Sequence, residues 1–319
     1  MIESKYKPRI LVVGGAGFVG SNLCRRLLAD DKQVICIDDL STGQEGNLKQ
    51  FIQDSPFEFI LHDVTEPLHI DGDVDEIYNL ACPASPIQYQ KDPVKTFKTS
   101  VIGSINLLEL AKEKHSRILL ASTSEVYGNA METPQREDYY GNANPNGPRS
   151  CYDEGKRGAE VLFSDYHRIY GVDTRIIRIF NTYGPNMRVD DGRVISTFIA
   201  QALKGVRLTI NGDGTQTRSF MYIDDLIEGM IRTMSSDSSG NSPINIGNPD
   251  ERSIKNLAET IQRLTHSSCG IVYRPLPEND PNRRCPDISR AQRQLGGWHP
   301  KISLEEGLIK TINYFKTLI

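Results

Sequence analysis

The feature that most constrains the fold is a short apolar run that stops at closely spaced glycines and continues directly into a helical pattern. Residues 9–13 read RILVV, and Gly14, Gly17 and Gly20 follow before leucines recur on one face of SNLCRRLLAD. This order predicts a strand, a tight turn and a helix. Glycines at this spacing permit the turn and let the backbone approach a pyrophosphate at the helix N-terminus. The segment therefore predicts a dinucleotide-binding unit.

Further strand-like runs alternate with helical patterns through the first 180 residues. The runs QVICID, FEFIL, EIYNLA, RILLAS and DTRIIRIF are nearly continuous in apolar residues. Continuous apolar strands that alternate with helices indicate a parallel sheet covered on both faces. We therefore expect an α/β fold with a Rossmann-type, doubly wound parallel sheet.

The rhythm of the sequence changes after residue 180. Residues 181–219 are richer in Gly, Asn, Asp and Arg, whereas FMYIDDLIEGMIRTM followed by PINIGN indicates a helix and a strand that return to the sheet. We predict that residues 1–180 and 220–250 form the dinucleotide-binding Rossmann domain. Residues 181–219 and 251–319 are then expected to form a smaller, discontinuous C-terminal substrate domain.

Composition and charge exclude several classes of partner. The net charge is -4 and no block of like charge stands out, which argues against a nucleic acid or an anionic membrane surface as partner. No run of about 18 apolar residues could cross a bilayer, and the first residues lack a signal-like apolar segment, so we expect a cytoplasmic protein. The six cysteines are scattered without a zinc-binding spacing, and we expect no metal.

Acidic residues at the ends of the predicted strands suggest which dinucleotide binds. Asp38 ends the second strand, where its carboxylate can accept a hydrogen bond from a ribose 2'-hydroxyl. Asp38 and Asp39 would repel a 2'-phosphate, so we expect NAD rather than NADP, although either acid could be an exposed turn residue. Asp63 ends the third strand and could meet the adenine edge, but Asp before a turn is common.

A tyrosine and a lysine four residues apart supply a candidate base. On a helix Tyr152 and Lys156 share one face, and a lysine ammonium beside a phenol lowers a phenol pKa that is normally about 10. The phenolate can then remove a hydroxyl proton. The pair alone carries little weight, because on the order of one YxxxK occurs by chance in such a chain. Asp153, Glu154 and Arg157 are interpreted as a solvated charged face.

Polar residues directly after the strand that starts at Arg117 strengthen this hypothesis. Thr123, Ser124 and Glu125 lie just beyond its carboxyl end, where open α/β sheets bind ligands. The Thr123 hydroxyl could hydrogen-bond the same substrate oxygen that Tyr152 deprotonates. Alternatively, the segment is only a cap, because Ser or Thr followed by Glu begins many helices.

Several motifs taken together resemble a known family. GGAGFVGSNL, STSEVYG, YDEGK and RIFNTYGP are similar to the extended short-chain dehydrogenases/reductases that act on nucleotide sugars. Four longer runs resemble the UDP-glucuronate decarboxylases, also called UDP-xylose synthases, within that family: LACPASPIQYQKDPVKTFKTSVIGSINLLELAK, NPNGPRSCYDEGKRGAE, DDGRVISTFIAQALKG and GDGTQTRSFMYIDDL. The resemblance covers nearly the whole chain. It implies NAD as cofactor, UDP-glucuronate as substrate and a homodimer through helices 94–114 and 152–170, whose apolar positions could equally face only the sheet.

The resemblance also implies the residues of each site. The implied catalytic set is Thr123, Glu125, Tyr152, Lys156 and Arg284. The implied NAD contacts are Gly14, Gly17, Phe18, Val19, Gly20, Asp38, Asp39, Ser41, Thr42, Gly43, Asp63, Val64, Leu80, Cys82, Thr99, Tyr152, Lys156, Thr182 and Arg193. The implied substrate contacts are Pro83, Lys98, Asn106, Asn181, Arg193, Arg218, Tyr222 and Arg284. The family usually has a basic residue where this chain has Cys285.

The implied reaction begins with oxidation of the sugar. Tyr152 would remove the 4-hydroxyl proton while the C4 hydride passes to NAD, which leaves a ketone beta to the C5 carboxylate. Such a β-keto acid loses carbon dioxide, and reprotonation at C5 with return of the hydride gives UDP-xylose. Glu125 would either repel the substrate carboxylate or orient a proton donor for C5. Arg284 would bind the carboxylate or assist reprotonation, or form an ordinary surface salt bridge.

Related activities remain as alternatives. Many 4,6-dehydratases have an Asp-Glu pair where this chain has Ser124 and Glu125, and GDP-mannose dehydratases typically use NADP, against which Asp38 argues. UDP-sugar 4-epimerases usually have a small or hydroxylated residue in place of Glu125 and are the second candidate. A decarboxylase that stops at the 4-keto pentose and releases NADH is another. A non-catalytic NAD-binding regulator on the same fold is disfavoured by the intact Tyr152 and Lys156.

Overall fold

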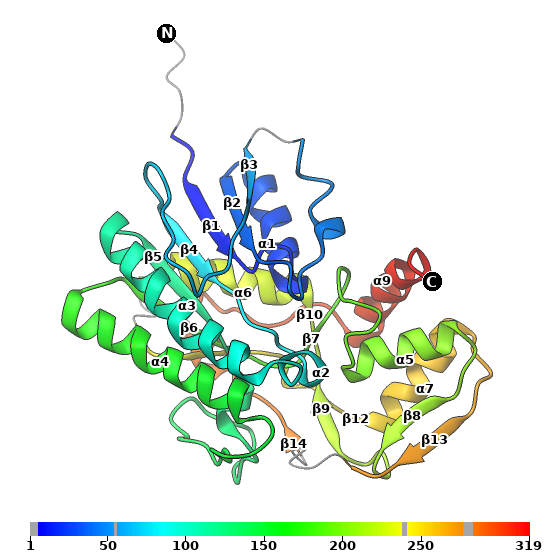
Figure 1. Cartoon of the computed structure of the whole chain (residues 1–319). Helices are drawn as coiled ribbons and strands as arrows, with labels where there is room; N and C mark the ends of the chain where they lie inside the picture. The colour runs from blue at the N-terminus through cyan, green and yellow to red at the C-terminus, as the bar shows by residue number, and fades with distance from the viewer. Residues whose placement is uncertain (1–5, 54–55, 238–240, 277–282) are drawn as a thin grey trace.

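Seven strands form the central sheet of the computed structural model (Figure 1), and every neighbouring pair runs parallel. The structure describes residues 6–53, 56–237, 241–276 and 283–319. In sheet order the strands are β11 (Ile244–Ile246), β6 (Thr174–Ile179), β5 (Arg117–Thr123), β4 (Glu76–Asn79), β1 (Arg9–Val13), β2 (Gln33–Asp38) and β3 (Phe57–Leu61). The predicted Rossmann-type α/β fold is confirmed.

Helices cover both faces of this sheet. One face carries α1 (Phe18–Ala29) and α6 (Ile223–Ser235), and the other carries α3 (Pro93–Lys114) and α4 (Ser150–Tyr170). None of the helices in the described ranges is long and apolar enough to span a bilayer.

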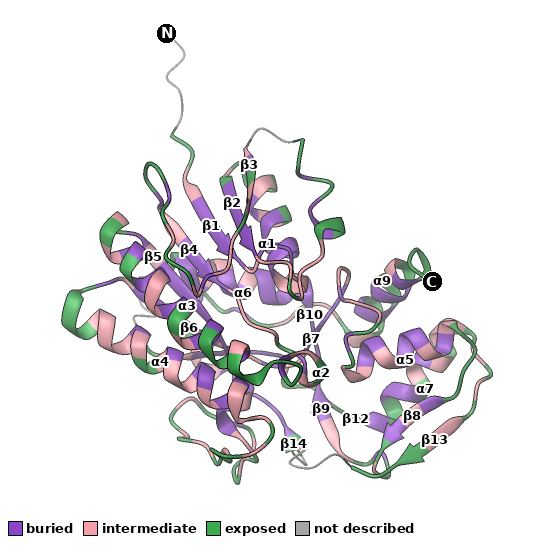
Figure 2. Cartoon of the chain, in the orientation of Figure 1, coloured by how far each residue is buried: buried purple, intermediate pink, exposed green. Residues whose placement is uncertain are grey.

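The continuous apolar character of β1 follows from this two-sided cover. Ile10 and Val12 pack in the core on the α1 side, whereas Leu11 and Val13 pack in the core on the α3 side. Successive side chains of a strand point to opposite faces of the sheet, so a strand that is covered twice needs an apolar residue at every position. Figure 2 shows the resulting buried strands at the centre of the molecule.

A second region, built from short elements, lies beside the carboxyl ends of the sheet strands (Figure 1). Its three small sheets pair β10 with β7, β9 with both β12 and β14, and β13 with β8. Their strands are β7 (Thr182–Tyr183), β8 (Leu208–Asn211), β9 (Thr217–Ser219), β10 (Met221–Tyr222), β12 (Glu251–Ser253), β13 (Ile271–Arg274) and β14 (Arg283–Arg284). The helices of this region are α5 (Val194–Leu203), α7 (Ile254–Thr265) and α9 (Leu304–Lys316).

Two features of the second region bear on the site. The parallel register of β14 and β9 places Arg284 opposite Arg218. The short helix α8 (Ser289–Gln294) returns to pack against β11, and the Trp298 indole donates a 3.3 Å hydrogen bond to the Asp225 carbonyl of α6. Part of segment 251–319 therefore packs on the Rossmann sheet, although its strands belong to the small sheets.

Three further short elements connect the sheet strands. They are the 3-10 helix η1 (Glu45–Asn47), the helix α2 (Pro86–Tyr89) and the 3-10 helix η2 (Ser124–Tyr127). The last two follow the carboxyl ends of β4 and β5, the edge of the sheet at which ligands bind in such folds.

Candidate active site

The glycine turn between β1 and α1 is too tight for side chains. Gly14 has φ +81°, and a Cβ there would lie 2.9 Å from the Ala81 backbone nitrogen. A Cβ on Gly20 would lie 2.2 Å from the Gly14 carbonyl oxygen, so Gly20 lets α1 begin directly against the turn. Gly17 is the N-cap and brings no side chain to the helix N-terminus. The backbone N–H groups there form the kind of site that binds a pyrophosphate.

Asp38 joins the glycine turn to the segment after β2. Its carboxylate accepts hydrogen bonds from the Ala16 N–H (2.9 Å) and the Leu40 N–H (2.8 Å), and only 7% of the residue is exposed. Burial raises the pKa of Asp38 above its usual value, even though the two backbone donors act in the opposite direction. The alternative that Asp38 is an exposed turn residue is therefore wrong.

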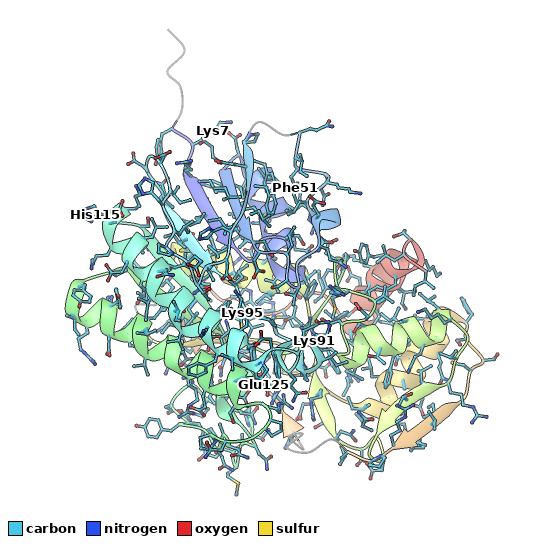
Figure 3. All side chains as sticks on the ribbon, viewed as in Figure 1. Lys7, Phe51, Lys91, Lys95, His115 and Glu125 are labelled. Carbon is cyan, nitrogen blue, oxygen red and sulfur yellow. The ribbon has the colours of Figure 1, made fainter. Side chains whose placement is uncertain are left out.

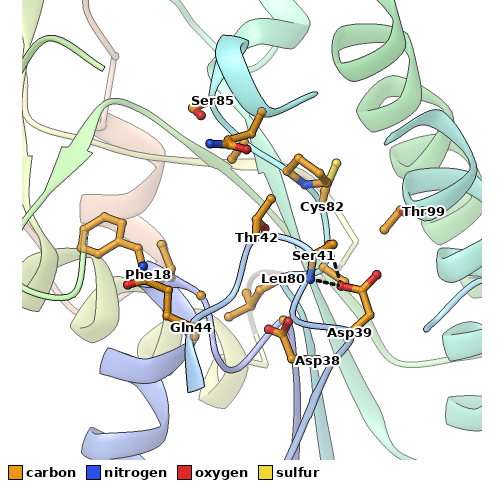
Figure 4. A pocket seen from close by; sticks show the side chains of 18 of the residues that line it. Phe18, Asp38, Asp39, Ser41, Thr42, Gln44, Leu80, Cys82, Ser85 and Thr99 are labelled. Atoms are coloured by element: carbon orange, nitrogen blue, oxygen red, sulfur yellow. Dashed lines mark hydrogen bonds between the residues drawn. The ribbon is translucent and has the colours of Figure 1, made fainter. Parts of the chain in front are cut away.

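Asp39, the next residue, does form a turn. Its carboxylate accepts hydrogen bonds from the Ser41 N–H (2.9 Å) and hydroxyl (2.6 Å), as the dashed lines in Figure 4 show. Lys95 of α3 lies 3.8 Å from Asp39 and pairs directly with Asp63. Burial raises the pKa of Asp63, but the hydrogen bonds from Lys95 and Thr65 together outweigh it, and the pKa ends below its usual value. Lys95 was not predicted, although it stands in the first turn of the helix after β4.

One cavity gathers most of the residues proposed for the cofactor. It is lined by Gly14, Gly17, Phe18, Val19, Gly20, Asp38, Asp39, Ser41, Thr42, Asp63, Val64, Leu80, Cys82, Thr99 and Arg193, and also by Pro83 from the substrate set. Gly43 lies behind this lining, where a Cβ would come within 2.6 Å of the Asp38 carboxylate. A helix N-terminus, a carboxylate beside it and apolar walls fit the pyrophosphate, ribose and adenine of NAD.

Tyr152 and Lys156 are both buried near the start of α4. The Tyr152 ring stacks on Tyr89, with centroids 5.0 Å apart and planes 2° from parallel. The Lys156 ammonium donates a 2.9 Å hydrogen bond to the Ala121 carbonyl of β5. Burial raises the pKa of Tyr152 well above its usual value, although a hydrogen bond with the Thr123 hydroxyl lowers it. The predicted lowering of the Tyr152 pKa is thus wrong for the protein alone, because desolvation outweighs the polar neighbours.

Thr123 combines the two roles considered for it. Its hydroxyl accepts a 3.2 Å hydrogen bond from the Glu125 N–H and caps η2, and the same hydroxyl interacts with the Tyr152 side chain. The residue therefore links the tyrosine to the segment that carries Glu125.

Glu125 lies at the centre of a buried charge cluster. Arg284 pairs with both of its carboxylate oxygens, one contact being 2.9 Å, and Arg149 donates a 2.7 Å hydrogen bond. Burial raises the pKa of Glu125, but the charges of Arg284, Arg149 and Arg218 outweigh it and the pKa lies below its usual value. Figure 3 labels Glu125 beside the N-terminal end of α4, which carries Arg149. The Rossmann sheet and the second region meet at this cluster.

Two members of this cluster behave differently from the expectations. Only 5% of Arg284 is exposed, so the alternative of a surface salt bridge is wrong. Arg149 was not predicted, although it precedes the tyrosine by three residues and is the N-cap residue of the same helix.

Cys285, next to Arg284, is buried against Gln135, whose side-chain oxygen accepts a 2.8 Å hydrogen bond from the Cys285 N–H. Burial raises the pKa of the Cys285 thiol to about 11.

Asp153 is buried, whereas the sequence placed it on a solvated face. It is 6% exposed, and its Oδ1 has no hydrogen-bond partner. The reason is the orientation of α4: Gly155 packs against Ser100 of α3, so Asp153 faces the opposite way, toward η2. Arg157, one turn later on the same side, donates to the Val126 carbonyl of η2. Glu154 remains partly exposed and pairs with Arg157 at 3.5 Å, in line with the expected charged face.

Other unsatisfied polar atoms gather near Tyr152. In the described part of the chain the buried side-chain polar atoms that lack a partner include, besides the Asp153 oxygen, the Tyr89 and Ser85 hydroxyls of the α2 segment. Native proteins satisfy nearly all such groups, so an exception needs an explanation. A polar ligand beside Tyr152 would provide the missing partners.

The structure brings together only part of the proposed substrate set. Arg218 and Arg284 meet at Glu125, whereas Lys98 is exposed on α3. The Asn106 amide donates to the Val64 (2.8 Å) and Glu66 (3.1 Å) carbonyls, and of these two residues Val64 lines the cavity. Two further members lie at the junction between the regions: the Asn181 carbonyl accepts a hydrogen bond from the Met221 N–H, and the Tyr222 ring lies edge-on to Tyr183. Thr182, proposed as a cofactor contact, lies there too, and its hydroxyl donates to the Phe180 carbonyl.

Arg193, proposed for both ligands, lies where the cavity opens toward the second region. Its guanidinium pairs with Asp191 at 2.5 Å and lies 5.8 Å from the centre of the Phe18 ring. Arg193, Asp191 and Phe18 all line the cavity. Asp191 was not predicted, because an acid two residues before an arginine gives no signal of its own.

Comparison with known proteins places this geometry in a family. A family model described as GDP-mannose 4,6 dehydratase matches residues 11–311. UDP-glucuronic acid decarboxylase 6 of Arabidopsis thaliana is 56% identical over 301 residues, covering 94% of this chain and 86% of the relative. UDP-glucuronic acid decarboxylase 1 of Danio rerio is 50% identical over 314 residues, covering 98% of this chain and 74% of the relative.

Solved structures of related epimerases share the fold. UDP-glucuronic acid 4-epimerase from Bacillus cereus, in complex with UDP-glucuronic acid and NAD, has a TM-score of 0.87 at 31% identity and covers 98% of this chain and 100% of its own. UDP-glucose 4-epimerase from Thermotoga maritima, with UDP-glucose, has a TM-score of 0.88 at 28% identity and covers 97% and 99%. The much higher identity to the decarboxylases decides between these branches: the chain belongs to the UDP-glucuronic acid decarboxylase family of the extended short-chain dehydrogenases/reductases.

Proposed function

We propose that this enzyme converts UDP-glucuronate to UDP-xylose and carbon dioxide with tightly held NAD. The observation that carries the proposal is the buried cluster of Glu125, Arg149 and Arg284, linked through Thr123 to Tyr152. The identity of 50–56% to curated UDP-glucuronic acid decarboxylases supports the same activity.

The cavity at the carboxyl ends of β1, β2 and β4 is the proposed NAD site. The N-terminus of α1 would hold the pyrophosphate, Asp38 would accept from the adenosine ribose, and Val64 and Leu80 would contact the adenine side. NAD bound there would accept the hydride from sugar C4 and later return it, so the reaction has no net change in cofactor. The NAD-bound 4-epimerase of similar fold supports this placement.

Tyr152 is the proposed base for the sugar 4-hydroxyl, with Thr123 sharing that oxygen. Because burial raises the pKa of Tyr152, the phenolate needs nearby positive charge when the substrate is bound. Lys156, 3% exposed and one helical turn away, is the fixed cation of this part of the site. Burial lowers the pKa of Lys156, so its positive charge is itself expensive to hold and is stabilised by the Ala121 carbonyl.

The charge cluster suits a substrate that carries a carboxylate. Arg149 and Arg284 both pair with Glu125, so two guanidinium groups lie at this end of the site, where they would attract the sugar carboxylate. After oxidation at C4 the electrons of the breaking C5–C6 bond move into the ketone, and Tyr152 and Thr123 would stabilise the enolate oxygen. Because Glu125 is held by two arginines, orienting a proton donor for C5 suits it better than repelling the substrate.

The exposed apolar side chains of α3 and α4 bear on the state of assembly. We propose a homodimer through α3 and α4, because both helices expose apolar side chains: Val94, Phe97, Ile102, Val161 and Ile169. The molar mass in solution, measured by light scattering after size exclusion, would be twice that of the 35.8 kDa chain. A monomer would contradict the proposal. A cytoplasmic location is proposed from the sequence alone.

Product analysis tests the proposed activity. The purified protein is incubated with UDP-glucuronate, and with UDP-glucose as the matched substrate that lacks a carboxylate, while carbon dioxide and the nucleotide sugars are measured. We expect carbon dioxide and UDP-xylose in equal amounts from UDP-glucuronate and no product from UDP-glucose. Formation of the C4 epimer without carbon dioxide would favour the epimerase alternative. Carbon dioxide with matching NADH would favour a decarboxylase that stops at the 4-keto pentose.

A further inference from the structure

Asp153 is a buried acid with no role in the mechanism derived so far. It follows Tyr152 directly, is 6% exposed and has a carboxyl oxygen without a hydrogen-bond partner. A buried carboxylate that lacks partners is costly, whereas a protonated carboxyl group is much less so. The residue thus occupies a position that favours carrying a proton beside the site.

The charges around Asp153 act in the same direction. The titratable and charged groups that act on it are Glu125 of η2, Arg284 of β14, Tyr89 of α2, and Arg149, Cys151, Tyr152 and Glu154 at the start of α4. Burial raises the pKa of Asp153, the negative charge of Glu125 raises it further, and the two arginines only partly compensate, so that the pKa is about 7. Asp153 therefore exchanges its proton in the neutral range, while Glu125 stays ionised.

The proposed reaction needs one such proton in each turnover. The proton that Tyr152 takes from the 4-hydroxyl returns to the same oxygen, and the hydride returns to C4. Loss of carbon dioxide leaves the electron pair of the C5–C6 bond in an enolate, and C5 must then gain a proton that the substrate has not supplied. This inference rests on the proposed function, because only decarboxylation requires that proton.

We propose that Asp153 stores the proton that is delivered to C5 and passes it on through Glu125. In this sequence the Asp153 carboxyl group loses its proton to Glu125, and Glu125 gives the proton to C5 as the enolate electrons form the C5–H bond. A hydronium ion or buffer acid then reprotonates Asp153 and supplies the one proton that each decarboxylation consumes. Binding of the sugar carboxylate to Arg284 assists, because it draws that arginine away from Glu125. Asp153 acts through Glu125 and is a positioning residue rather than a catalytic one.

The test compares Asp153→Asn with Glu154→Gln, a carboxyl-to-amide change at the next residue of α4. Oxidation and loss of carbon dioxide precede proton uptake, so D153N is expected to accumulate the decarboxylated enolate together with NADH, while turnover to UDP-xylose falls roughly a hundredfold. In the wild type kcat declines as the pH rises through about 7, because the protonated form is the active one. D153N loses this decline, Asp153→Glu partly restores activity, and E154Q matches the wild type.

Two results would overturn the proposal. One is a D153N enzyme with wild-type turnover and pH profile; the other is a D153N enzyme that loses activity without any build-up of NADH. A second measurement needs no turnover: infrared titration of the substrate-free protein should show a carboxyl band that disappears near neutral pH and is missing from D153N. If that band is absent, Asp153 stores no proton. If the band is present but the wild type releases no carbon dioxide, the proposed function fails instead.

Discussion

The two ends of the candidate site are built in opposite ways. At the cofactor end, polar groups are satisfied by nearby backbone: Asp38 accepts from Ala16 and Leu40, and Asp39 closes its own turn with Ser41. At the sugar end, charged side chains from η2, the start of α4 and β14 converge on Glu125, and unsatisfied buried atoms remain nearby.

The cofactor end therefore supplies a fixed shape, whereas the sugar end supplies the charged groups that would react. The cofactor end is close-packed backbone, so its shape changes little, and Lys95 and Arg193 are paired there with neighbouring acids. The sugar end concentrates buried charge, which is expensive and is retained where an active site must hold and move protons. Substitutions at the cofactor end should therefore act on binding and stability, and substitutions at the sugar end on turnover.

The largest effect is expected for Tyr152→Phe. The ring still packs on Tyr89, so folding and NAD content should be unchanged, while turnover falls by roughly a thousandfold because the base is lost. Tyr166→Phe is the matched control: Tyr166 also belongs to α4, and its hydroxyl donates to the exposed carboxylate of Glu109 on α3. Steady-state kinetics and bound NAD are measured for both. Turnover above one tenth of the wild type in Y152F would refute its role.

The next effect concerns the pair of Arg284 and Glu125. In Arg284→Met the Glu125 carboxylate keeps its hydrogen bond from Arg149 but loses the one from Arg284. The change should lower the free energy of unfolding by about 2 kcal/mol and abolish most of the activity. Adding Glu125→Gln removes the stranded charge, so stability should recover while activity does not. Urea unfolding of the single and double variants checks this. If the double variant is no more stable than R284M, the stranded charge of Glu125 does not cause the loss of stability, which would contradict this account.

At the cofactor end, Gly20→Ala should act on packing and binding. The new Cβ would lie 2.2 Å from the Gly14 carbonyl oxygen, so α1 must shift, at a cost of about 1–3 kcal/mol. We expect at least tenfold weaker NAD binding, with most turnover restored at saturating NAD. Gly46→Ala is the control, because no atom lies within 4 Å of the added Cβ. Calorimetric titration with NAD compares the two, and unchanged affinity in G20A would contradict this account.

The smallest effect is expected for Asp39→Ser. Asp39 should repel the 2'-phosphate of NADP, but its side chain is 29% exposed and Lys95 lies 3.8 Å away, so the repulsion is partly screened. The ratio of the NADP to the NAD dissociation constant should fall by less than tenfold. A complete switch to NADP would show that Asp39 rather than Asp38 sets the preference.

The same contrast explains what the sequence could predict. The sheet, the glycine turn and Asp38 depend on residues close together in the chain, so local patterns were sufficient. The sugar end depends on contacts between distant segments. Arg149 looks like any arginine before a helix, and its partner Glu125 is 24 residues away.

Sequence patterns failed mainly to predict which charged and polar side chains are buried. Asp153 stands among charged residues in the first turn of a helix, where an acid is ordinarily solvated, and only the packing of α4 on η2 buries it. In the same way the spacing of Tyr152 and Lys156 placed them on one face but gave no measure of desolvation, which reversed the predicted direction of the tyrosine pKa shift.

The most direct test of the central claim follows labelled atoms through one reaction. UDP-glucuronate with carbon-13 at C6 is incubated with the protein in D2O and monitored by NMR. The account predicts labelled carbon dioxide and UDP-xylose that carries one deuterium at C5 and the original hydrogen at C4. Label that stays in a hexuronate, or deuterium that enters C4, would contradict it.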